Sequence, residues 1–235
     1  MKTMKTTMAT TTLCALLLST AALAAPTAPT DEVLRADLGA VLQKIGADGA
    51  TLTPQAVARV KKHVERILAK PTLSQTWERR QKLWPTIAGA LAAQGLPEEL
   101  GYLAWAESGF RSDATSPMGC KGVWQFIPTT ARAYGLTVVD GGADDRLDLA
   151  KESQAAAKYL KKLMADFEGA PLLALAAYNQ GETQVRRIVQ AAPAEHAKDF
   201  FWLAEQGAFN EEGTEYVPKI LAAAVIGMNA ARYGL

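Results

Sequence analysis

Glu107 lies at the end of a segment whose pattern predicts a helix, and its position there suggests an acid catalyst. Leu100, Leu103 and Ala104 form an apolar stripe at helical spacing, and the next turn of this stripe arrives at Glu107. Gly109 predicts the end of the helix, which puts the carboxyl in the last turn. Burial and the negative end of the helix dipole both raise the pKa of a carboxyl. A carboxyl that keeps its proton near neutral pH can act as a general acid.

The spacing alone also allows two other arrangements of Glu107. Its side chain could point into solvent, or it could pair with Arg111. The residue types in the loop that follows favour the role of Glu107 as an acid catalyst. Within it, Trp124 and Phe126 offer apolar surface that can stack on a ring, and Gln125 between them offers amide donors and an acceptor. This mixture suits a sugar ligand. The alternative is a core loop that Trp124 plugs.

The elements that must position these residues are all helical. No segment shows the alternation of a strand, and Ala and Leu dominate the periodic segments, so we predict an all-α fold. Pro85 is expected to kink or split one helix. The predicted helices cover residues 31–45, 54–70, 74–94, 97–108, 128–134, 148–166, 171–179, 182–191 and 216–231.

The N-terminal residues are predicted to be a secretory signal peptide over residues 1–24. Lys2 and Lys5 precede a short apolar run and a small-residue cleavage site, and the run is shorter than the roughly 20 residues that a membrane anchor needs. Cys14 does not lie in a lipobox. The chain is therefore expected to be exported to the periplasm without a lipid anchor. Residues 25–71 are predicted to form a tether and helical extension, and residues 72–235 the main domain.

Composition narrows the function classes. The 25 basic and 24 acidic residues leave a formal net charge of +1, which argues against nucleic acid as a partner. No later segment predicts a transmembrane span, and a monomer is favoured. Cys120, the one cysteine left after removal of the signal peptide, is expected to be a buried small side chain or a reactive thiol. His63 is expected at a helix surface, and neither it nor His196 has a metal-ligand partner at useful spacing.

The candidate residues fall in four motifs, which are Glu107-Ser108, Gly-Val-Trp-Gln-Phe-Ile-Pro at 122–128, Ala-Tyr-Asn-Gln-Gly at 177–181, and Glu212 followed by Tyr-Val-Pro-Lys at 216–219. In this order the motifs resemble the catalytic domain of the soluble lytic transglycosylases, the SLT domain, and most closely its membrane-bound lytic transglycosylase D branch. The resemblance covers about residues 72–230 and implies a fold similar to goose-type lysozyme with an N-terminal helical extension. Ile127 departs from it, because many relatives have Met there, and Cys120 and Lys121 stand where small residues are usual.

The resemblance also implies roles for individual residues. Glu107 matches the catalytic acid and base, while Ser108 and Glu212 match supporting residues. Substrate-binding positions are matched by Ser116, which would hold the acetamido group of the sugar, and by Gln125, Tyr178, Asn179 and Tyr216. No metal and no cofactor is implied.

The implied reaction is that of a carbon–oxygen lyase. The enzyme would cleave the β-1,4 bond between N-acetylmuramic acid and N-acetylglucosamine in peptidoglycan and leave 1,6-anhydro-N-acetylmuramic acid ends. Usual glycosidases need a second carboxylate, whereas here Glu107 would act alone. Two alternatives remain: a muramidase-type hydrolase on the same fold, and a non-catalytic cell-wall-binding or secretion-associated protein.

Overall fold

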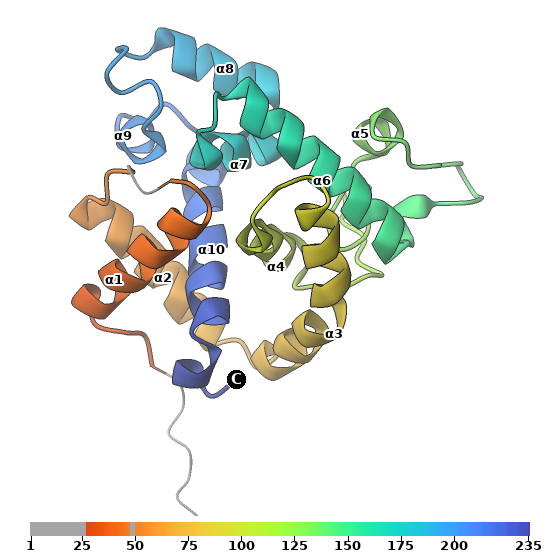
Figure 1. The fold of residues 1–235 in the computed structure, drawn as a ribbon, viewed down its shortest axis with the longest axis horizontal. Helices are drawn as coiled ribbons and strands as arrows, with labels where there is room; N and C mark the ends of the chain where they lie inside the picture. The colour runs from red at the N-terminus through yellow and green to blue at the C-terminus, as the bar shows by residue number, and fades with distance from the viewer. Residues whose placement is uncertain (1–26, 48–49) are drawn as a thin grey trace, which may run out of the picture.

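The computed structural model describes residues 27–47 and 50–235, and within them the protein is helical without a strand (Figure 1). This confirms the predicted all-α class. The predicted signal peptide lies outside the described residues. The α-helices are α1 Asp31–Lys44, α2 Pro54–Leu68, α3 Leu73–Ala92, α4 Tyr102–Ser108, α5 Pro128–Ala133, α6 Leu149–Asp166, α7 Pro171–Gln180, α8 Glu182–Ala191, α9 Phe200–Glu205 and α10 Glu211–Met228.

Helix α10 runs through the middle of the molecule and holds the other elements together. Figure 1 shows it between the α1–α2 pair and α4, and α2 and α4 make its most extensive contacts. Twelve residues of α10 are buried, among them a run of small alanines that lets neighbouring helices approach. Gly227 permits the closest approach, because a Cβ there would lie 2.1 Å from the Tyr102 ring on α4. The core is therefore built around the two helices that carry Glu107 and Tyr216.

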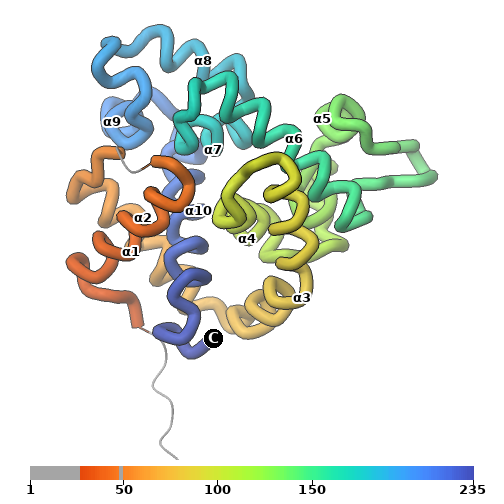
Figure 2. Tube along the Cα trace, viewed as in Figure 1, coloured from red at the N-terminus to blue at the C-terminus, as the bar shows by residue number. Residues whose placement is uncertain are grey.

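A second group of helices covers the other side of α4. Helix α3 packs along α6, α6 packs on α7, and the trace in Figure 2 shows α3 and α6 side by side. A short 3-10 helix, Glu98–Gly101, joins α3 to α4 and packs on α3. The loop that joins α4 to α5, residues 109–127, contains Ser116 and Gln125 and is hydrogen-bonded to α6 through Trp124.

The N-terminal helices begin at side-chain caps. The hydroxyl of Thr30 accepts from the Val33 N–H, and that of Thr53 accepts from the Ala56 N–H with Pro54 at the first helical position. These signals explain why the predicted and observed starts of α1 and α2 coincide. The observed α2 also shows a long apolar face, which packs on α10.

The expectation that His63 lies at a helix surface is wrong. Its side chain is only 7% exposed and lies between α2 and α10, where Nε2 is 2.7 Å from Oε2 of Glu215. Arg59 binds the other oxygen of the same carboxylate at 2.6 Å. The sequence of α2 alone does not reveal this, because the partner of His63 is 152 residues away in the chain.

Other differences from the predicted elements have local causes. Helix α3 continues through Pro85, since buried Trp84 and Ile87 on either side fix both halves against the core. Helix α10 starts five residues earlier than predicted, because the Asn210 side chain caps it at the Gly213 N–H. Helix α9 was not predicted; the Asp199 carboxylate caps two of its amides.

Candidate active site

Helix α4 ends at Gly109, which adopts the left-handed conformation with φ 61°. The predicted stripe is confirmed, because Leu100, Leu103 and Ala104 are buried. The stripe leads to Glu107, whose side chain is half-buried in the last turn.

Glu107 faces the protein interior and a pocket, and the Tyr216 hydroxyl of α10 donates a hydrogen bond to its Oε1. Burial raises the pKa of Glu107 above its ordinary value. The hydrogen bond from Tyr216 and the positive charge of Lys219 act in the opposite direction, and the negative charge of Glu212 adds to the rise. Desolvation dominates, so the net effect of the site is to raise the pKa of Glu107.

The alternative pairing of Glu107 with Arg111 is not what the structure adopts. Arg111 Nε instead donates to the backbone carbonyl of Ser108 at 3.1 Å. The Ser108 hydroxyl accepts from the Arg111 backbone amide and donates to the Val123 carbonyl at 2.8 Å. Ser108 therefore fastens the end of α4 to the loop that follows.

The pocket that Glu107 lines has a volume of about 500 Å³ and is strongly basic. Among the residues that the structure describes, Glu107 supplies the only carboxylate of its lining. The other lining residues are Ile67, Lys70, Thr72, Gln75, Thr76, Arg79, Trp105, Ala106, Ser108, Gly109, Arg111, Lys219 and Ala223.

Trp124 and Phe126 are 0% and 3% exposed, so the prediction that they offer a stacking surface for a sugar is wrong. The alternative of a Trp-plugged core loop is correct: the Trp124 indole N–H donates to Ser153 on α6 at 3.0 Å. Gln125 adopts a left-handed backbone with φ 52°, and its side-chain amide donates to the carbonyls of Gly122 and Ala114. Gln125 thus links residues of the same loop to one another.

Ser116 lies at the start of the same loop and is half-buried. Its hydroxyl oxygen accepts from the Cys120 backbone amide at 3.1 Å. Within the described residues no acceptor is recorded for its proton, which leaves the hydroxyl able to donate. Cys120 has a free thiol and is half-buried, which lies between the two predictions of a buried small side chain and a reactive thiol.

Tyr178 and Tyr216 bring two phenols to the neighbourhood of Glu107. The Tyr178 hydroxyl donates to the Trp124 carbonyl at 2.8 Å. Burial raises the pKa of both phenols well above the ordinary value, and the Glu107 charge raises them further. Tyr216 contacts Glu107 directly instead of facing an open groove.

Asn179 and Glu212 form a pair at the edge of the site. The Asn179 amide donates to the Glu212 carboxylate at 3.0 Å, and Gln180 donates to the Asn179 side-chain carbonyl at 2.5 Å. The pair ties the end of α7 to the start of α10, the two helices that carry Tyr178 and Tyr216. The basic pocket is not lined by the other predicted substrate-binding residues Ser116, Gln125, Tyr178 and Asn179. Glu107 therefore stands between that pocket and the loop that carries Ser116 and Gln125.

Glu152 was missed by the sequence reasoning. It is 0% exposed, and its two oxygens accept from the backbone amides of Val123 and Trp124 at 3.0 and 3.3 Å. Burial raises the pKa of Glu152 to about 8. A Cβ at Gly122 would lie 2.2 Å from this carboxylate, so only glycine fits there. The stripe that Glu152 shares with Ala156 in α6 was the available signal.

Arg146 was missed as well. Its guanidinium is buried, pairs with Asp144 at 2.7 Å and donates to the carbonyls of Gly119 and Phe126. The hydrogen bonds from Arg146 hold the pKa of the Asp144 carboxyl well below its usual range. No local pattern around Arg146 predicts this role, because the loop carbonyls that it binds are brought to it by the fold.

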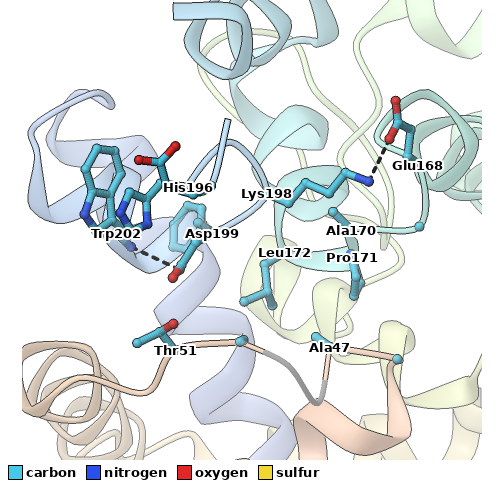
Figure 3. A pocket seen from close by; sticks show the side chains of 15 residues that line it. Ala47, Thr51, Glu168, Ala170, Pro171, Leu172, His196, Lys198, Asp199 and Trp202 are labelled. Carbon is cyan, nitrogen blue, oxygen red and sulfur yellow. Dashed lines mark hydrogen bonds and ion pairs between the residues drawn. The ribbon is translucent and has the colours of Figure 1, made fainter. Parts of the chain in front are cut away.

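Figure 3 shows another pocket, of about 510 Å³, away from Glu107. The rings of His196 and Trp202 stack there at 4.2 Å, and Lys198 pairs with Glu168 at 2.7 Å. None of the predicted site residues lines this pocket. Within residues 27–47 and 50–235, no three His, Cys, Asp or Glu side chains gather as a metal site, and no helix has the length and apolarity to span a bilayer.

Known proteins resemble this chain in sequence. It is 37% identical over 149 residues to membrane-bound lytic murein transglycosylase D of Escherichia coli, an alignment that covers 63% of this chain and 32% of that protein. It is 39% identical over 122 residues to peptidoglycan transglycosylase gp16 of Escherichia phage T7, covering 52% of this chain and 9% of the phage protein. The chain thus spans about a third or less of these relatives.

The fold also has a known counterpart. The crystal structure of an inactive mutant of lytic transglycosylase Slt from Pseudomonas aeruginosa superimposes with a TM-score of 0.53 at 21% identity, over 86% of this chain and 31% of that one. The model of the transglycosylase SLT domain matches residues 84–201, half of the 235-residue chain and the part that contains Glu107 and the loop. The chain therefore belongs to the transglycosylase SLT domain family.

Proposed function

We propose that this chain is a peptidoglycan lytic transglycosylase in which Glu107 acts as the single acid and base. One observation carries the proposal: a desolvated carboxyl, bonded to Tyr216, is the only acid lining a pocket next to a loop rich in hydrogen-bonding groups. The names of the relatives, murein and peptidoglycan transglycosylases, support the substrate class.

In the first step, protonated Glu107 donates to the glycosidic oxygen between N-acetylmuramic acid and N-acetylglucosamine. The C1–O bond breaks as the muramoyl C1 gains oxocarbenium character. Because the Tyr216 hydroxyl occupies Oε1, Oε2 is the oxygen that carries the proton. When Glu107 has lost the proton, the same hydrogen bond stabilises the carboxylate.

The substrate supplies the group that a second carboxylate would otherwise provide. Its acetamido oxygen stabilises C1, and the Ser116 hydroxyl, with a proton free to donate, is proposed to hold the acetamido group. The muramoyl C6 hydroxyl then attacks C1 while the Glu107 carboxylate takes its proton. The product is a 1,6-anhydromuramoyl end, and the enzyme returns to its protonated state.

The remaining site residues act around this centre. Tyr178 is proposed to contact the reacting sugar, Gln125 to shape the loop side of the groove, and Asn179 to contact substrate beside Glu212. Ser108 is proposed to support Glu107 by holding α4 against the loop.

The organisation of the chain follows from the same proposal. Residues 72–235 would form the catalytic domain, and residues 25–71 an extension docked on it, which the packing of α1 and α2 on α10 supports. A peptidoglycan enzyme must reach the cell wall, so we propose export to the periplasm with removal of residues 1–24, and action as a monomer.

Clearing of purified peptidoglycan sacculi tests the proposal. Wild type should reduce the turbidity of the suspension, while Glu107→Gln should bind sacculi without clearing them. Equal clearing by both proteins would remove Glu107 from the mechanism, and absence of clearing by both would favour the non-catalytic wall-binding alternative. The hydrolase alternative, with water as acceptor, predicts the same clearing and differs in the mass of the products.

A further inference from the structure

Four cationic side chains face the pocket that Glu107 lines. Lys70 comes from the connection between α2 and α3, Arg79 from α3, Arg111 from the turn after α4, and Lys219 from α10. They reach one pocket from segments that are far apart in the sequence. Among the described residues no acid other than Glu107 lines the pocket, so the four cations outnumber its acids whether or not Glu107 is ionised.

None of the four cations has a carboxylate partner among the described residues. Arg79 donates to the Gly109 carbonyl at 2.9 Å and to the Thr76 hydroxyl at 3.0 Å. These neutral acceptors orient the guanidinium without neutralising it. Arg111 is held in the same way by a backbone carbonyl. Each guanidinium therefore keeps donors for an incoming anion.

Lys219 feels charges of both signs. Burial lowers the pKa of Lys219, the negative charge of Glu107 raises it, and the like charge of Lys70 lowers it again. An anion bound between Lys219 and Lys70 would offset the repulsion between these two side chains. Guanidinium groups pair with carboxylates and phosphates in a planar, two-point geometry, and carboxylates are the anions of this kind that the proposed substrate carries.

We propose that this basic pocket binds a carboxylate carried on the lactyl arm of the muramoyl residue being cleaved. The inference rests on the proposed function. In peptidoglycan the lactyl group at C3 carries a stem peptide with free carboxylates, and in strands without peptides the lactyl carboxylate itself is free. We assign the pocket to the stem peptide. Through Lys70, the segment before α3 would then take part in substrate selection.

The test uses variants that lie at the exposed rim. Lys70 and Arg111 are both exposed, so the double variant Lys70→Gln/Arg111→Gln should fold, and its thermal unfolding should match wild type. Lys82→Gln is the matched control, since Lys82 is also exposed, lies on α3 and is outside the pocket. Activity is measured on three glycan preparations: strands with stem peptides, strands stripped of peptides by an amidase, and stripped strands whose lactyl carboxylates are converted to neutral methyl amides.

The double variant should lose roughly tenfold to a hundredfold in kcat/KM on peptide-bearing strands, mainly through KM, because two charge-assisted contacts are removed. Its loss on neutral strands should be at least about tenfold smaller. Wild-type activity on peptide-bearing strands should fall with added salt more steeply than that of the variant.

The three preparations separate the sources of the carboxylate. A loss confined to peptide-bearing strands supports the stem peptide. A loss confined to stripped strands supports the lactyl carboxylate and contradicts the assignment to the stem peptide, and a loss on both forms supports a pocket that accepts either carboxylate. Equal losses on all three preparations, or none, would overturn the inference while leaving the transglycosylase assignment intact. Binding of the same strands to the Glu107→Gln protein, with and without the rim substitutions, gives the answer without cleavage. It therefore decides the inference even if the proposed function fails.

Discussion

Two carboxyls in this protein, the half-buried Glu107 and the fully buried Glu152, have raised pKa values for the same physical reason and nevertheless differ in what they can do. Burial is the largest cause in both cases. Glu107 stands in the last turn of α4, where the helix dipole opposes ionisation, and Glu152 stands in the first turn of α6, where the dipole favours it. The contrast shows that desolvation can dominate at either end of a helix.

The partners of the two carboxyls explain the difference in role. Both oxygens of Glu152 are occupied by backbone amides of the loop, and the side chain has no access to solvent. Glu107 has one oxygen bonded to a phenol and lines an open pocket. A proton on Glu107 can reach a substrate, whereas a proton on Glu152 serves only the fold. A raised pKa therefore identifies a candidate catalyst only together with access.

The largest expected effect comes from exchanging each carboxyl for its amide. Glu107→Gln should lower the rate of peptidoglycan cleavage by about a thousandfold or more, because the proton donor is lost, while its unfolding temperature stays near that of wild type. Glu152→Gln should retain most of the cleavage rate. Cleavage rates and unfolding temperatures are measured for wild type and both variants. Similar cleavage rates for the two variants would contradict the difference in role between Glu107 and Glu152.

Shortening Glu152 should be costly for stability. Glu152→Ala leaves the Val123 and Trp124 amides without acceptors and opens a cavity, which together should lower the free energy of unfolding by about 3–5 kcal/mol. Urea denaturation measures this loss. A change below about 1 kcal/mol would mean that the loop does not depend on the carboxyl.

Tyr216→Phe tests how the hydrogen bond from Tyr216 affects the pKa and the catalytic role of Glu107. The hydrogen bond from Tyr216 lowers the pKa of Glu107, so its removal raises that pKa further. The high-pH limb of the kcat/KM profile, which reports loss of the Glu107 proton, should move to higher pH. The maximal rate should fall roughly tenfold, since the carboxylate formed during the reaction loses a charge-assisted hydrogen bond. A limb that moves to lower pH would contradict this.

The last difference between the two carboxyls concerns the pH dependence of stability. The pKa of Glu152 is about 8 in the folded protein against an ordinary 4.5, so between these values the folded state holds a proton that the unfolded chain has released. Stability from this group is complete below pH 4.5 and falls as pH rises toward 8, by at most about 1.4 kcal/mol per pH unit.

Glu152→Gln cannot ionise and should reduce this slope. The amide variant should be less stable than wild type at pH 5, because it offers only one acceptor oxygen to two amides, and should approach or exceed wild type at pH 8. Parallel slopes in urea denaturation of the two proteins would mean that Glu152 is ionised throughout.

Local signals predicted much of the fold. Thr53 before Pro54, the apolar stripe toward Glu107 and Gly109 after it fix helix ends through interactions within a few residues, and the structure agrees with them. The predicted motif residues likewise lie around Glu107 or in the adjoining loop.

Long-range partners account for what the sequence did not reveal. From the sequence, Trp124 is predicted to offer a surface for sugars. In the structure its indole N–H donates to Ser153 of α6. Glu152 lies on an Ala-rich stripe that marks a buried face only weakly. The basic pocket is assembled from residues as far apart as Lys70 and Lys219, which only the packing of α2 on α10 brings together.

The most direct test of the central claim, that one desolvated carboxyl performs the whole reaction, is the mass of the muropeptides released from sacculi. The account predicts that wild type releases products ending in 1,6-anhydro-N-acetylmuramic acid, lighter by one water than reducing ends, and that Glu107→Gln releases none. Reducing ends from the wild type, or anhydro ends from Glu107→Gln, would contradict it.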